Sequence, residues 1–200
     1  MEKCHLTCVC SVALGNHCIR AVDLESGRVF LLAGTPEVPE KSEILPSYSN
    51  GRSCTDCFLS PKGIAVKSSS IGNNYTILVT DSSFDGDYYN EDGRQYFILR
   101  ISIPKDGIGR DWSSVSVDSA GILPIPCDPS GLALTPDGES AILSCPEENS
   151  IYKYDTSTGA VHIIAGLMEP GYLDAFYVSR FRFPQGVAVS PDGKWALIAE

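Results

Sequence analysis

An internal repeat constrains the fold of this chain more than any other feature of its sequence. Residues 19–34 and 151–166 align without a gap, and they share an Ile, an Asp, two Gly, a Val and an Ala at matching positions. A unit of this length usually cannot bury its apolar face alone, so copies of it stack on one another. The sequence therefore predicts a repeat architecture before any single residue is interpreted.

Two further landmarks recur and give the order of strands within the unit. The pattern Pro-x-Gly-aliphatic-Ala-aliphatic occurs at 61–66, 129–134 and 184–189, and the last two copies run into Pro-Asp-Gly and a second apolar segment. Gly and Pro supply the backbone angles of tight turns, so each copy predicts a strand, a turn and a second strand. A Ser/Thr-Gly hairpin and a closing Ala-Gly complete a unit of four strands.

Four short antiparallel strands per unit, without a segment of helical period, are typical of a β-propeller blade. We therefore predict an all-β chain, a β-propeller of four-stranded antiparallel blades, with 1–200 as a single propeller region. The blades are assigned to about 6–34 (partial), about 61–121 (with insertions), about 129–166 and about 184–200 (partial), and 35–56 is a loop insertion.

The residues that follow the Ala-Gly landmark carry a family resemblance. Gly171, Asp174, Phe181 and the Pro-x-Gly and Pro-Asp-Gly elements resemble the blade signature of NHL-repeat β-propellers, and 15–19 resembles the Asn-His element of that family. The chain departs from the signature at 68–74, which replaces Pro-Asp-Gly, and at Pro126, which replaces the Phe. A further departure is Ser144, which replaces the Asp that the segment 61–121 has as Asp81.

The resemblance also implies a blade count. Members of this family usually close a ring of about six blades, so the resemblance implies that this chain is an incomplete, open arc. The alternative is a closed ring of four blades, in which 184–200 completes the blade begun by the N-terminal strands.

Charge argues against a nucleic-acid partner. The chain has 15 Lys and Arg against 25 Asp and Glu, a net charge of −10, whereas phosphate binding requires clustered cations. The one local basic cluster is Arg180 and Arg182, which we take as candidate binding residues. The flanking Phe181 and Phe183 are expected to point to one side of a strand as packing anchors. No segment of the sequence, 1–14 included, is predicted to span a membrane.

Cysteine and histidine provide few candidates for chemistry. Cys54 and Cys57 have the spacing of a disulfide, a redox pair or a metal knuckle, but no second ligand pair follows them. Cys10, Cys18 and Cys145 fall in predicted strands, where a free thiol packs as a small apolar group. The chain has 3 His and no Gly-x-Ser-x-Gly element, so a His-based triad is not expected.

Acidic and amide side chains near strand ends are weak metal candidates. The resemblance extends to six-bladed enzymes that hold a divalent cation, such as calcium, near the central axis. The residues to consider here are Asp81, Asn149, Asp174 and Glu200. We favour a structural role, because Asp and Asn after a strand accept hydrogen bonds from turn amides, and we expect no cofactor.

The sequence favours a non-enzymatic interaction or scaffold module that binds a protein partner through its loops and faces. The polar insertions at 35–53 and 83–95 are expected to be exposed, and Tyr88 and Tyr89 are the candidate anchors within the second. The alternative is a fragment of a metal-dependent six-bladed propeller hydrolase, lactonase or lyase, with part of its site in other blades.

Overall fold

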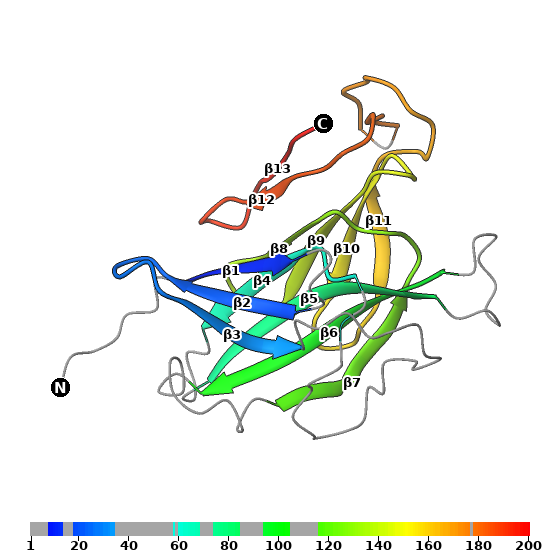
Figure 1. Cartoon of the computed structure of the whole chain (residues 1–200). Helices are drawn as coiled ribbons and strands as arrows, with labels where there is room; N and C mark the ends of the chain where they lie inside the picture. Colours follow the sequence, from blue (N-terminus) through cyan, green and yellow to red (C-terminus); the bar gives the residue numbers. More distant parts are fainter. Residues whose placement is uncertain are drawn as a thin grey trace. The chain divides into compact units, whose positions relative to one another are not determined.

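The computed structural model describes residues 8–13, 18–34, 58, 60–68, 74–84, 94–104, 116–176 and 178–200 (Figure 1). Within these residues the chain is all-β and its strand pairs are antiparallel, as predicted. The chain forms two compact units. The first comprises Met1–Gln95 and Leu99–Ile122, and the second comprises Tyr96–Ile98 and Leu123–Glu200.

The first unit contains a sheet of three strands and most of a sheet of four. The three-stranded sheet has the order β1 (Cys8–Ala13), β2 (Cys18–Asp23), β3 (Val29–Gly34). The four-stranded sheet has the order β4 (Ile64–Ser68), β5 (Asn74–Phe84), β6 (Arg94–Pro104), β7 (Ser116–Ile125), and parts of β6 and β7 belong to the second unit.

Buried apolar residues from both sheets form the core of the first unit. Ile19 on β2, Val79 on β5 and Leu99 on β6 are each fully buried in it. Burial of aliphatic side chains supplies most of the free energy that holds such sheets together. The cluster also contains Ala21, Leu32, Ala33, Phe58, Ile77, Ile101 and Ile103.

The second unit contains a complete four-stranded sheet and a hairpin. The sheet has the order β11 (Val161–Ala165), β10 (Ser150–Asp155), β9 (Ser140–Cys145), β8 (Gly131–Leu134). The hairpin consists of β12 (Val187–Val189) and β13 (Ala196–Ile198), and β12 packs against β8 and β9. The predicted order of strand, Pro-Asp-Gly turn, strand, strand, Ser/Thr-Gly hairpin and strand is present between β8 and β11.

The two aligned segments have the same local structure. Each strand pair shifts register at the same aligned place, after Ile19 in β2 and after Ile151 in β10. In the turns that follow, Gly27 and Gly159 have positive φ angles of 69° and 76°, a backbone conformation that favours Gly. Their amides donate to the carbonyls of Asp23 and Asp155 at 2.8 Å in both copies. The repeat found in the sequence is therefore a repeat of structure.

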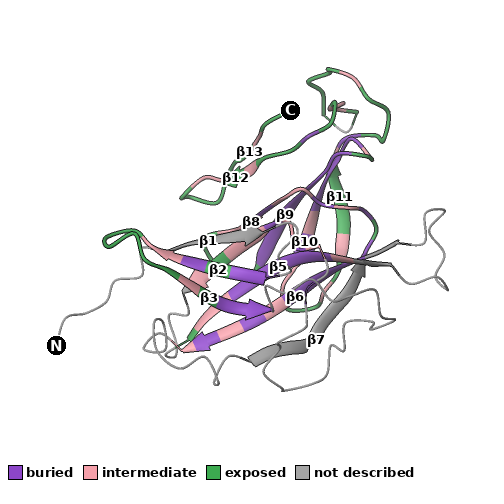
Figure 2. Cartoon of the chain, in the orientation of Figure 1, coloured by how far each residue is buried: buried purple, intermediate pink, exposed green. Residues whose placement is uncertain are grey.

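Burial differs sharply between strands of the second unit (Figure 2). Every residue of β9 is buried; β9 lies between β8 and β10 in the sheet and also contacts β12. Strand β11, at the edge of the same sheet, has exposed side chains at its three central positions. In the part of the chain that the structure describes, no helix has the length and apolar character needed to cross a bilayer.

Candidate functional site

The four residues considered as metal ligands have separate structural surroundings. The buried Asp81 carboxylate, within β5, accepts hydrogen bonds from the backbone amides of Ser60 (2.7 Å) and Ser82 (2.9 Å). Asp174 is exposed on the connection between β11 and β12. Among the described residues, no group of three or more His, Cys, Asp or Glu side chains is arranged to hold a metal ion.

Asn149 holds the two ends of the connection between β11 and β12. Its side-chain Oδ1 accepts the backbone amide of Phe183 at 2.9 Å, and its Nδ2 donates to the carbonyl of Met168 at 3.1 Å. Asn149 is buried and has a φ of 50°, a conformation that Asn tolerates better than most residues. In the aligned repeat Asn149 takes the place of His17, which lies outside the described residues.

The strand register corrects the alignment of Ser144 with Asp81. The Gly of each Pro-x-Gly element lies opposite one residue of the following strand. The amide of Thr80 donates to the carbonyl of Gly63, Gly131 pairs with Ser144, and the amide of Ala199 donates to the carbonyl of Gly186. Thr80, Ser144 and Ala199 are therefore equivalent. The residues that follow them, Asp81, Cys145 and Glu200, are equivalent too, so Asp81 corresponds to Cys145. The error arose because the sequence pattern fixes the strands but leaves their register open by one residue.

Each of these three residues ties its strand to the segment before a Pro-x-Gly element. Asp81 accepts the amide of Ser60, and Glu200 accepts the amide of Arg182 at 2.7 Å. Cys145 forms a disulfide with Cys127, two residues before Pro129, with the Cα atoms 5.9 Å apart. The same position therefore links a strand to the preceding segment in all three copies, through a carboxylate in two of them and through a disulfide in the third. Asp81 and Glu200 therefore each hold a strand to the segment that precedes its Pro-x-Gly element.

The disulfide corrects the prediction that Cys145 is a free thiol. Cys18, by contrast, is a buried free cysteine, and burial raises the pKa of its thiol against the opposing influence of Arg20. A buried neutral thiol is a packing group rather than a nucleophile. Cys54 and Cys57 lie outside the described residues, so their pairing stays a prediction.

Arg180, one of the two candidate basic binding residues, has an acidic partner, and the binding role of Arg180 and Arg182 stays a prediction. The Arg180 guanidinium pairs with Glu169 at 2.7 Å, and its side chain packs over Gly171. The expected alternation of Phe181 and Phe183 is wrong, because the segment is not a continuous strand. Phe183 has a φ of 56° and is exposed, while Phe181 is half-buried.

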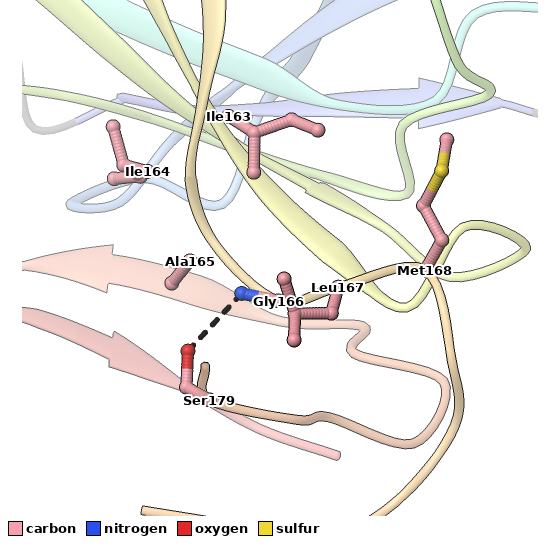
Figure 3. A pocket seen from close by; sticks show the side chains of 7 residues that line it. All are labelled: Ile163, Ile164, Ala165, Gly166, Leu167, Met168 and Ser179. Atoms are coloured by element: carbon pink, nitrogen blue, oxygen red, sulfur yellow. Dashed lines mark hydrogen bonds between the residues drawn. The ribbon is translucent and has the colours of Figure 1, made fainter. Parts of the chain in front are cut away.

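An apolar cavity of about 310 Å³ lies at the end of β11 (Figure 3). The amide of Gly166 donates to Ser179 Oγ at 3.1 Å across its wall. No lining residue titrates near neutral pH, so the cavity suits an apolar side chain rather than an acid–base reaction. The lining residues are Ile163, Ile164, Ala165, Gly166, Leu167, Met168 and Ser179.

The sequence prediction missed this cavity and the exposed aromatic residues that follow it. Tyr172 and Phe176 are 82% and 84% exposed on the connection between β11 and β12. The bridge between Leu173 and Arg180 closes this connection into a hairpin-like loop. The signal that was available is the unbroken apolar segment 163–168, which is longer than an edge strand needs. Tyr88 and Tyr89, which were predicted as anchors, lie outside the described residues.

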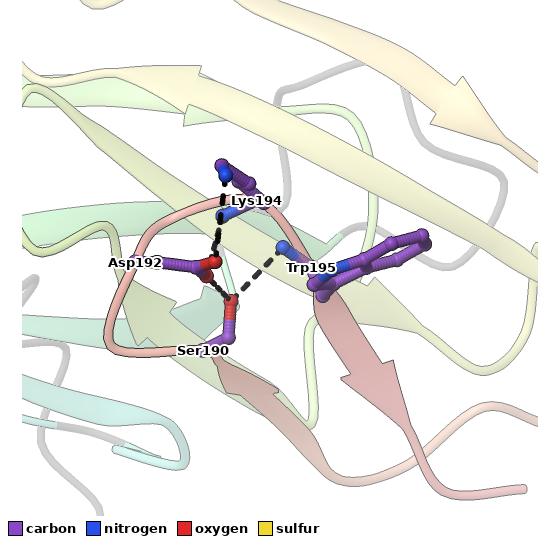
Figure 4. A network of polar contacts seen from close by, with 4 residues as sticks. All are labelled: Ser190, Asp192, Lys194 and Trp195. Atoms are coloured by element: carbon purple, nitrogen blue, oxygen red, sulfur yellow. Dashed lines mark hydrogen bonds and ion pairs between the residues drawn. The ribbon is translucent and has the colours of Figure 1, made fainter.

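The Pro-Asp-Gly turn between β12 and β13 shows why its Asp is structural (Figure 4). The Asp192 carboxylate accepts the Ser190 hydroxyl at 2.6 Å and the Lys194 amide at 3.2 Å. These donors lower the pKa of Asp192, with the Ser190 hydroxyl making the largest contribution. Asp137 makes the matching contacts in the turn between β8 and β9, which confirms the predicted turn role of both residues.

The Tyr152 hydroxyl already has an acidic hydrogen-bond partner. Its hydroxyl donates to the carboxylate of Glu148. Burial, and then this carboxylate, raise the pKa of Tyr152, so the phenol stays protonated at any physiological pH. The described residues thus offer an apolar cavity and exposed aromatic side chains, rather than a catalytic constellation.

Comparison with known proteins gives only a distant likeness. No family model matches the chain, and no curated protein matches it. Among solved structures, it is distantly similar to β-propeller-containing proteins. One is an auxiliary nutrient binding protein from Bacteroides thetaiotaomicron VPI-5482, at 12% identity and a TM-score of 0.29, covering 96% of this chain and 32% of that one.

Two further solved structures are similarly distant in sequence and in structure. An auxiliary nutrient binding protein from Bacteroides ovatus ATCC 8483 has 12% identity, a TM-score of 0.37 and coverage of 88% and 44% of the two chains. TolB from Acinetobacter baumannii has 16% identity, a TM-score of 0.30 and coverage of 94% and 44%. The chain spans less than half the length of each of these proteins, and similarity this low carries no argument about function.

Proposed function

We propose that the chain is an NHL-type β-propeller interaction module, which binds another protein through exposed loops rather than catalysing a reaction. The four-stranded order of β8 to β11 and the repeated hairpins support the propeller assignment. Asp81, Asn149 and Glu200 each accept a hydrogen bond from a backbone amide. This structural role favours an interaction module over a metal-dependent hydrolase or lyase.

The observation that carries the proposal is the loop between β11 and β12. Tyr172 and Phe176 are almost fully exposed, while Asn149 and the bridge between Leu173 and Arg180 hold the loop in shape. The same loop contributes Leu167, Met168 and Ser179 to the cavity lining. Exposed aromatic side chains on a loop that is held in shape are typical anchors of protein–protein interfaces. Tyr88 and Tyr89 remain proposed as additional anchors.

Site-specific photo-crosslinking in the native cell tests this proposal. A photoreactive phenylalanine analogue is placed at Phe176 or Tyr172, and at Thr158 as a control, since Thr158 is exposed in the hairpin between β10 and β11. We expect a discrete crosslinked protein from the two aromatic positions and none from Thr158. The same band from all three positions, or no band from any, would contradict the proposal.

A further inference from the structure

Strand β5 begins with the sequence Asn74-Tyr75-Thr76, which is the acceptor pattern for an N-linked sugar, Asn-x-Thr with a middle residue other than Pro. No other Asn of the 200-residue sequence is followed two positions later by Ser or Thr. The pattern is short, so the structural surroundings of Asn74 decide whether it can carry a sugar.

Asn74 lies at the exposed end of a strand that is otherwise mostly buried. The register pairs Ser68, the last residue of β4, with Tyr75, so Asn74 lies one position beyond the end of β4. Asn74 is exposed, whereas residues 77–81 of the same strand are buried. Because β5 lies between β4 and β6 in its sheet, this exposure belongs to the strand end and not to an unpaired edge. A bulky, hydrated sugar fits at such a position.

The side-chain amide of Asn74 is held at the surface in a way that leaves room for a sugar bond. Its Nδ2 donates to Ser102 Oγ on β6 at 3.1 Å, and this hydrogen bond is exposed to solvent. An Asn amide nitrogen carries two hydrogens, so one can stay on Ser102 while a sugar replaces the other. Thr76 lies on the same face of β5 as Asn74, because side chains alternate along a strand.

The disulfide between Cys127 and Cys145 is a second, independent observation that points to the same modification. Both half-cystines are buried, and they belong to the second unit of the chain, whereas Asn74 belongs to the first. Disulfides form and persist in oxidising compartments such as the lumen of the endoplasmic reticulum and the cell exterior. N-linked sugars are found on surface positions of secreted proteins, so the disulfide and the acceptor pattern indicate one cellular route.

We propose that Asn74 carries an N-linked oligosaccharide. The donor is an oligosaccharide bound to a polyprenyl pyrophosphate. A bond forms between Asn74 Nδ2 and the anomeric carbon of the first sugar, the bond from that carbon to the pyrophosphate breaks, and the lipid pyrophosphate leaves together with one proton from Nδ2. This inference does not depend on the binding of another protein by the loop between β11 and β12.

Mass spectrometry of the chain isolated from its native cell tests the proposal at a single residue. Peptide-N-glycosidase converts a glycosylated Asn to Asp, and in water that carries a heavy oxygen isotope it labels that Asp. We expect the label at position 74 and none at the neighbouring Asn73, which has Tyr75 two positions later and serves as the internal control. Asn74 recovered without sugar and without label would overturn the proposal.

Three variants expressed in the same cell test the acceptor pattern. Asn74→Gln and Thr76→Ala should each lose the mass that the glycosidase removes from the parent chain, whereas Thr76→Ser should keep it, because Ser preserves the hydroxyl that the pattern requires. Circular dichroism verifies that each variant is folded. A glycosidase-sensitive mass that persists in Asn74→Gln or in Thr76→Ala would overturn the assignment to Asn74.

Discussion

The hairpins β8–β9 and β12–β13 carry nearly the same sequence pattern and nearly the same turn, yet their side chains differ in burial. Ile142 on β9 is 6% exposed, whereas Leu197 at the equivalent position of β13 is 66% exposed. The local turn is specified by Pro, Asp, Gly and a hydroxyl within each hairpin. In the part of the chain that the structure describes, β9 pairs with a strand on both edges and also contacts β12, whereas β13 pairs with β12 alone, so the same turn occurs in two different surroundings.

The largest expected difference between the hairpins comes from truncating their equivalent aliphatic residues. Ile142→Ala should destabilise the chain by about 2–5 kcal/mol, because it leaves a cavity in a packed strand. Leu197→Ala should change the free energy of unfolding by less than about 0.5 kcal/mol, as expected for an exposed position. Urea unfolding of the two variants at low protein concentration measures both values. Similar losses would mean that β13 is buried in solution.

A smaller difference is expected from the equivalent glycines. A Cβ on Gly131 would lie 2.5 Å from the carbonyl oxygen of Gln185 and 2.6 Å from Ser144 Oγ, while one on Gly186 would meet only Ala199 Cβ at 3.5 Å. Gly131→Ala should therefore cost about 1–3 kcal/mol, because β12 must move away from β8. Gly186→Ala should be close to neutral. A neutral Gly131→Ala would show that β12 does not pack on β8 as described.

The smallest effect concerns the pH dependence of the turns. The Ser190 hydroxyl and the Lys194 amide stabilise the charged form of Asp192, so its folded-state pKa is below the unfolded value of about 3.9. Its stabilising contribution is therefore present above about pH 4 and is lost as the pH falls through the lower folded-state pKa. Thermal unfolding of Asp192→Asn should show a smaller difference from the parent at acidic pH than at neutral pH. A constant difference would contradict this role.

Much of the fold was predictable from local residue chemistry. The Pro-Asp-Gly elements and the Ser/Thr-Gly hairpin were predicted to be turns because the side chains of such residues, or the lack of one, determine backbone conformation within a few residues. The order of strands followed from those turns. The NHL assignment is part of the proposed function.

Features that depend on contacts distant in sequence were not predictable in the same way. The disulfide between Cys127 and Cys145 depends on strand register, which the sequence pattern left uncertain by one residue. The two hydrogen bonds of the Asn149 side chain join residues 168 and 183, which are 15 positions apart. Phe183 also adopts a positive φ, which its residue type disfavours. The exposed Tyr172 and Phe176 were missed because the loop that carries them has no strand period.

Residue-resolved amide hydrogen exchange of the parent chain tests the central claim, that the two hairpins share a turn but differ in the strand pairing that the described residues give them. At low protein concentration we predict slow exchange for Leu143, whose amide faces β10, and fast exchange for the equivalent Ile198. The amide of Ala199, which bonds to Gly186 at 2.9 Å, should exchange more slowly than that of Ile198. Equal protection of Leu143 and Ile198 at every concentration would contradict the account.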